Sequence, residues 1–141
     1  MKELTKAKYW IFDLDNTLYS GETKVFEQVN KKMSKYISKK LNISIIEAKK
    51  IQKSYFYKFN TTLNGMIKNH QIDANEFLDF VHDVDIDFLK EDRKLNNELK
   101  KLNGKKIIFT NGSRKHAQNV TKRLGIDRCF DAIFDIVDSE F

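Results

Sequence analysis

Two aspartates close together in the chain, Asp13 and Asp15, directly follow a run of large apolar residues. The run, Tyr9 to Phe12, has the composition of a buried strand. Carboxylates at the end of such a strand are costly to bury, so each must be paired, bound to a metal ion or neutralised by a pKa shift. Open α/β sheets bind their ligands at this end of the strands. The pattern therefore predicts a metal-assisted site, and the alternative is a capped turn after a strand.

A second apolar run with a polar ending lies further along the chain and reads KKIIFTNGS, from Lys105 to Ser113. It predicts a strand over 106–110 that ends in Thr110. Asn111 and Gly112 then precede a helical pattern, and this order favours close approach of the backbone to an anion. A plain turn is the alternative interpretation of Asn111 and Gly112.

Together the two segments resemble motifs I and II of the haloacid dehalogenase superfamily, in which D-x-D-x-T-L follows the first strand. The stretches DNTLY and TNGSRKHAQNVTKRLGI are most similar to its pyrimidine 5′-nucleotidase-like branch. The resemblance implies a Mg²⁺-dependent phosphatase with a small phosphorylated substrate. That substrate would be a phosphate monoester, a nucleoside 5′-monophosphate and in particular a pyrimidine one, hydrolysed through an aspartyl-phosphate intermediate.

The resemblance also implies a role for each site residue. Asp13 would be the nucleophile and a Mg²⁺ ligand. Asp15 would protonate the leaving oxygen, deprotonate the hydrolytic water and ligate Mg²⁺ through its backbone carbonyl. The hydroxyl of Thr110 and the backbone N–H of Asn111 would hold the phosphoryl oxygens, with Gly112 allowing close approach.

Members of the superfamily also carry a third motif with a Lys, often followed by Pro, and a fourth with acidic residues. Neither is found before Phe141, and the chain contains no Pro. We therefore expect a truncated phosphatase with activity far below that of a complete member. The alternative is a catalytically weak or inactive fragment that acts at most as a binding module. A basic helical protein that binds nucleic acid is a third reading, but it ignores the first motif.

The expected fold class is α/β, a truncated Rossmannoid parallel sheet with an inserted α-helical cap. Residues 1–20 and 90–141 would form the core and residues 21–89 the cap. Within the cap, Ser44 with Glu47 and Asp73 with Glu76 mark helix starts, while Gly65 and residues 68–71 predict an interruption. The alternative is a short helix that begins at Gly65 to Ile67, before the break. A third strand is expected over 132–137. His116 is expected on the surface of its helix, and the alternative, which the resemblance to the branch suggests, is a structural role near the site.

Composition narrows the partners and the compartment. The net charge is +6, but the lysines are scattered along helical segments, which argues for a solvated surface and against a nucleic-acid partner. No apolar run approaches the ~20 residues of a membrane span, so no membrane partner is expected. A single cysteine, Cys129, fits a reducing, cytoplasmic setting.

The first strand is expected to lie at an edge of the sheet. In the superfamily a later strand pairs beside it, and that strand is not found in this sequence. Tyr9 to Asp13 would then present an apolar edge with unpaired backbone groups, through which the chain would self-associate.

Overall fold

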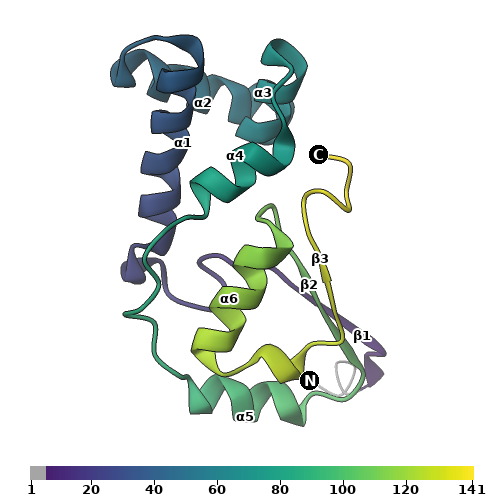
Figure 1. Cartoon of the computed structure of the whole chain (residues 1–141). Coiled ribbons are helices and arrows are strands. Elements are labelled where there is room, and N and C mark those ends of the chain that lie inside the picture. Colours follow the sequence, from purple (N-terminus) through teal and green to yellow (C-terminus); the bar gives the residue numbers. More distant parts are fainter. Residues whose placement is uncertain (1–5) are drawn as a thin grey trace. The chain divides into compact units, whose positions relative to one another are not determined.

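A computed structural model describes residues 6–141 of the chain (Figure 1). It confirms the α/β class, with six α-helices and a three-stranded parallel sheet among these residues. The elements in chain order are β1 (Tyr9–Phe12), η2 (Gly21–Thr23), α1 (Val25–Leu41), α2 (Ile45–Phe59), α3 (Thr62–His70), α4 (Ala74–Val81), α5 (Arg93–Lys101), β2 (Lys105–Phe109), α6 (Arg114–Leu124), η3 (Asp127–Cys129) and β3 (Ala132–Phe134). No helix in this described part is both long and apolar enough to cross a membrane.

The chain divides into two compact units. One contains the described residues up to Thr23 together with Ile86–Ile136, and so holds the whole sheet. The other contains Lys24–Asp85 and Val137–Phe141, and so holds α1 to α4. The predicted bounds of core and cap, and the role of the helical unit as a cap, stay predictions.

The sheet has the strand order β1-β2-β3, with both pairs parallel. Phe12 lies opposite Ile108, and Ile108 lies opposite Ile133. Parallel neighbours must be joined by crossovers, and the helix α6 supplies the crossover between β2 and β3. Since the strands run in one direction, the residues that follow each strand gather at one edge of the sheet.

Helix starts in the second unit follow the capping signals of the sequence. Ser44 and Glu47 form a reciprocal capping box at the start of α2, and Asp73 accepts a hydrogen bond from the N–H of Glu76 at the start of α4. Both predictions are confirmed. Each bond satisfies a backbone donor that the first turn of a helix leaves without a partner.

The predicted interruption at Gly65 is wrong, and the alternative of a short helix there is closer to the structure. Gly65 lies inside α3, which is capped by the side chain of Thr61 and ends at His70. A Cβ atom at Gly65 would lie 2.4 Å from the Cβ of Tyr55 on α2. The glycine is therefore required for the close approach of two helices, and it does not break either of them.

The third strand is shorter than predicted, because it ends at Phe134. Asp135 turns its carboxylate to the backbone N–H of Arg114, at 2.8 Å. The N–H of Ile136 donates to the carbonyl of Gly112, at 3.3 Å. These bonds join the chain to the start of α6, so residues 135–137 do not extend the strand. The second strand likewise ends at Phe109, one residue before the predicted Thr110.

Candidate active site

A tight turn after β1 carries both aspartates. The N–H of Leu18 donates to the carbonyl of Leu14 at 2.9 Å, and Asn16 takes a left-handed conformation with φ of 60°. Asparagine tolerates this conformation better than most residues. Leu14 is fully buried and anchors the turn, while Asp13 is exposed and the Asp15 side chain is 13% exposed.

Each aspartate accepts a hydrogen bond from the hydroxyl of the residue four positions later. The Thr17 hydroxyl donates to Asp13 Oδ2 at 2.8 Å. The Tyr19 hydroxyl donates to Asp15 Oδ1 at 2.5 Å. The turn thus supplies each carboxylate with a local donor that restricts its orientation.

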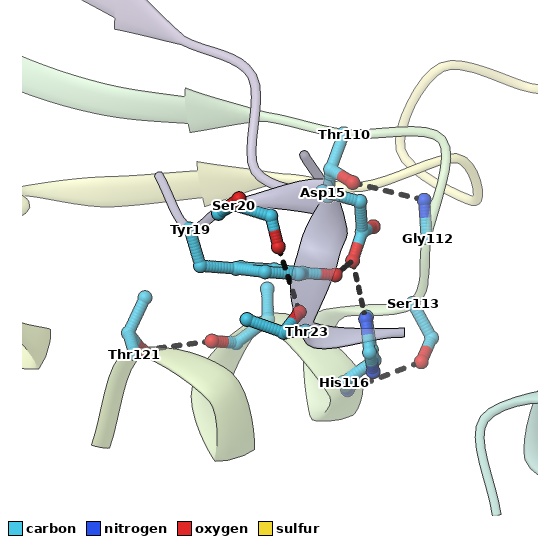
Figure 2. Close-up of polar contacts among 10 residues, drawn as sticks. Asp15, Tyr19, Ser20, Thr23, Thr110, Gly112, Ser113, His116 and Thr121 are labelled. Atoms are coloured by element: carbon cyan, nitrogen blue, oxygen red, sulfur yellow. Dashed lines mark hydrogen bonds and ion pairs between the residues drawn. The ribbon is translucent and has the colours of Figure 1, made fainter. Parts of the chain in front are cut away.

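His116 is a site residue, and the prediction that it lies on the surface of its helix is wrong. It is buried in the first turn of α6, and its Nε2 lies 2.8 Å from Asp15 Oδ1 (Figure 2). Its spacing of four residues from Val120 and of eight from Leu124 puts all three on the buried face of the helix. That spacing was the signal that could have identified it.

The electrostatics of the turn keep Tyr19 a hydrogen-bond donor. Burial raises the pKa of the Tyr19 hydroxyl well above its ordinary value, and the charge of Asp15, its hydrogen bond and the charge of Asp13 raise it further. The phenol therefore stays protonated at physiological pH and donates to Asp15.

The predicted phosphate-binding loop follows β2. Thr110 is buried, and its hydroxyl oxygen accepts the N–H of Gly112 at 3.0 Å. Because the oxygen is used as an acceptor, the hydroxyl proton can be donated to another group. Asn111 is exposed, and Ser113 caps α6 by accepting the N–H of His116 at 3.2 Å.

The structure brings all the predicted site residues to one edge of the sheet. Asp13 follows Phe12 and Thr110 follows Phe109, on two strands that pair in parallel. Asp15, Asn111 and Gly112 belong to the same two loops. The N-terminus of α6 begins at this edge, where the helix dipole favours an anion.

The metal ligands expected here are oxygen atoms. Within residues 6–141 no group of three or more His, Cys, Asp or Glu side chains is arranged to hold a metal ion. The exposed carboxylate of Asp13 and the backbone carbonyl of Asp15 are hard oxygen donors. That donor set fits Mg²⁺, which is commonly bound through one or two carboxylates, its substrate and several waters.

Comparison with known proteins gives two findings. A family model described as haloacid dehalogenase-like hydrolase matches residues 8–141. The chain is also similar to Phosphate metabolism protein 8 of Saccharomyces cerevisiae, at 36% identity over 137 aligned positions; the match covers 89% of this chain and 42% of the relative. The chain thus spans less than half the length of that relative.

Proposed function

The chain belongs to the haloacid dehalogenase-like hydrolases, and from this we propose that it is a phosphatase that hydrolyses phosphate monoesters. The observation that supports the proposal best is the gathering of Asp13, Asp15 and Thr110 at one sheet edge, beside the N-terminus of a helix. In-line phosphoryl transfer needs a nucleophile, a proton donor and groups that bind the phosphoryl oxygens. Those residue types are the ones found there.

Asp13 is the nucleophile of the proposed reaction. Its carboxylate is exposed, and Thr17 holds it through Oδ2 at 2.8 Å. A carboxylate oxygen attacks phosphorus, the bond from phosphorus to the leaving oxygen breaks, and an aspartyl-phosphate forms. A water molecule then attacks the same phosphorus, which frees Asp13 and releases inorganic phosphate.

Asp15 is the general acid and base of both steps. It gives a proton to the leaving oxygen in the first step and takes one from the attacking water in the second. It lies two residues after Asp13 on the same turn, and Leu14 between them is fully buried.

The loop after β2 binds the phosphoryl group. The Thr110 hydroxyl and the Asn111 N–H donate to its oxygens, and Gly112 orients Thr110 through its own N–H, at 3.0 Å. The dipole of α6 adds favourable potential for the negative charge. Donors fixed before the substrate arrives need little rearrangement during the reaction.

Mg²⁺ would be held by the Asp13 carboxylate and the Asp15 carbonyl, and when bound it would offset the negative charge of the phosphoryl oxygens. We further propose a nucleoside 5′-monophosphate, in particular a pyrimidine one, as substrate, because of the resemblance carried by DNTLY and the segment after β2. The name of the yeast relative, which refers to phosphate metabolism, agrees with a phosphate ester as substrate. A cytoplasmic setting is supported by the single cysteine, Cys129, which is free and buried.

The test is release of inorganic phosphate from a panel of nucleoside 5′-monophosphates, with Mg²⁺ and after its removal by EDTA. We expect Mg²⁺-dependent release that Asp13→Asn lowers by at least about a thousandfold. Glu98→Gln is the matched control, since Glu98 pairs with Lys101 on the exposed surface of α5. Nucleotide binding without turnover in the wild-type chain would contradict the proposal and favour a binding module.

A further inference from the structure

We propose that His116 and Tyr19 are positioning residues that together hold the Asp15 carboxylate in the orientation needed for proton transfer. The proposal rests on the proposed function, because it concerns the same Asp15. It adds two side chains that the motifs themselves do not assign to the reaction.

The first argument is that two donors converge on one oxygen. Both the Tyr19 hydroxyl, at 2.5 Å, and His116 Nε2, at 2.8 Å, contact Oδ1 of Asp15 (Figure 2). Tyr19 comes from the turn after β1, and His116 lies 101 residues beyond Asp15 on α6. The carboxylate is thus fixed both by its own turn and by a second element.

The second argument is what this convergence does to the carboxylate. The terminal torsion of an aspartate is broad and roughly two-fold, so an unrestrained carboxylate rotates. Two bonds to Oδ1 fix that rotation and therefore the direction in which Oδ2 points. A general acid must present its proton within hydrogen-bond reach of the leaving oxygen, and small misplacements are costly.

The third argument is that His116 is itself held in place. Its side chain is 2% exposed, and its backbone N–H is bound by the cap residue Ser113 at 3.2 Å. Oδ1 accepts in both protonation states of Asp15 when the proton to be transferred is carried on Oδ2, so the Nε2 of His116 must carry a proton. The ring therefore acts as a rigid donor with a defined tautomer.

Thr121, on the same helix, shows that a buried polar side chain can find its hydrogen-bond partner within its own helix. The buried hydroxyl of Thr121 donates to the carbonyl of Ala117, one turn back on α6, at 2.7 Å (Figure 2). His116 instead reaches a residue of another element.

The first experiment measures kcat and KM for the wild-type chain and for His116→Leu, His116→Gln and Tyr19→Phe. His116→Leu should lower kcat by about ten- to a hundredfold, part of what general acid–base catalysis contributes, with KM little changed. His116→Gln, which can place an N–H near the same point, should recover most of the loss. Tyr19→Phe should also lower kcat, and Thr121→Val is the matched control that should not.

A second measurement does not depend on turnover or on the leucine variant folding. Nitrogen-15 NMR of the His116 ring should show a proton on Nε2, and Asp15→Ala should shift the ring-nitrogen signals. A proton on Nδ1 alone, or signals unchanged in Asp15→Ala, would overturn the proposal. An active wild-type chain with equal kcat in folded His116→Leu would also overturn it. A wild-type chain without turnover would contradict the proposed function, and the NMR signals would still decide whether His116 holds Asp15.

Discussion

At the scale of single residues, the site depends on a repeated spacing of four. Asp13 is paired with Thr17 and Asp15 with Tyr19, because the chain forms one helical turn between Leu14 and Leu18. The two pairs are made by the same turn but serve different chemistry. Thr17 faces the proposed nucleophile and Tyr19 the proposed acid and base.

Replacing Thr17 by valine should lower kcat, because the proposed nucleophile Asp13 loses a hydrogen bond, and should leave the fold intact. The change removes the hydroxyl that donates to Asp13 Oδ2 at 2.8 Å and keeps the side-chain shape. We expect kcat to fall about tenfold, the value of one hydrogen bond to a charged group. The measurement is steady-state phosphate release.

The matched control for this change is Thr23→Val. Thr23 donates its hydroxyl to the carbonyl of Ser20 at 2.8 Å and contacts neither aspartate in that bond (Figure 2). It should leave kcat unchanged, and Thr17→Ser should restore activity. Equal activity of Thr17→Val and wild type would show that Asp13 needs no such donor.

The sequence revealed the motif residues of the site but not their supports. Asp13, Asp15 and Thr110 are found from two apolar runs with polar endings, and parallel pairing places them together. The bonds of Tyr19 and His116 to Asp15 were not predicted, for physical reasons. The bond of Tyr19 depends on the local turn geometry, and that of His116 joins residues 101 positions apart. Neither geometry can be read from residue type alone.

At the scale of helices and strands, local sequence signals predicted the starts of helices correctly and the interruption of one helix incorrectly. Caps act through neighbouring backbone groups, so Ser44 and Asp73 could be recognised from a few residues. A glycine in a helical pattern can either end the helix or allow a second helix to approach closely. Which of the two applies depends on the helix packed against it. At Gly65 that partner is Tyr55. The third strand ended early because Asp135 bonds to a distant backbone N–H.

Gly65→Ala should destabilise the helical unit. Alanine is the better helix former by about 0.5–1 kcal/mol, but its Cβ would lie 2.4 Å from the Cβ of Tyr55. Overpacking typically costs about 1–3 kcal/mol, so we expect a net loss of unfolding free energy. Urea unfolding measures the change.

Two further variants locate the cause of that loss. Asn75→Ala on α4 is exposed and should change the unfolding free energy by less than about 0.5 kcal/mol. In a Tyr55→Gly background, Gly65→Ala should lose most of its cost, since the Cβ and the ring of Tyr55 that it would meet are both gone. A full cost in that background would contradict the role given to Tyr55.

Alkaline pH should weaken the packing of α1 on α4 through Tyr36. Its hydroxyl donates to Glu76 at 3.1 Å, and its ring packs edge-on against Phe77, with centroids 5.0 Å apart. Burial, then the bond to Glu76 and its charge, raise the pKa of Tyr36 from 10.0 to about 12. The folded state thus holds the proton more tightly. This contribution to stability is complete below pH 10 and is lost as the pH rises through about 12.

The measurement is urea unfolding between pH 9 and pH 12 for the wild type and Tyr36→Phe. The free energy of unfolding should fall more steeply for the wild type, by up to roughly 2–3 kcal/mol over the range. Other groups that titrate there, Tyr19 included, are common to both proteins and cancel. If the free energies of unfolding of the two proteins fell equally with pH, Tyr36 would titrate alike in the folded and unfolded states.

At the scale of the whole molecule, the sheet is apolar on both faces. Ile108 is fully buried on one face, whereas the other face exposes Tyr9, Ile11, Phe109 and Phe134 by 64%, 72%, 48% and 48%. The register places Ile11 beside Ile107 and Phe109 beside Phe134, so these side chains are neighbours. Parallel sheets are normally covered on both faces, and a contiguous apolar surface marks a contact site.

The last prediction follows from this exposed apolar face and from the outer strand β1 at its side. β1 is an outer strand of the sheet and pairs only with β2 among the described residues. An apolar outer strand is a template for pairing, so we expect the 141-residue chain to self-associate. Size-exclusion chromatography with light scattering should show a mass that rises with concentration.

Ile11→Lys should return the chain toward a monomer, because a charge on an edge strand opposes pairing. Ile46→Lys on α2 is the matched control, since Ile46 is 70% exposed, and it should leave association unchanged. A wild-type monomer at the highest concentrations, or equal association of the two lysine variants, would contradict this role of β1.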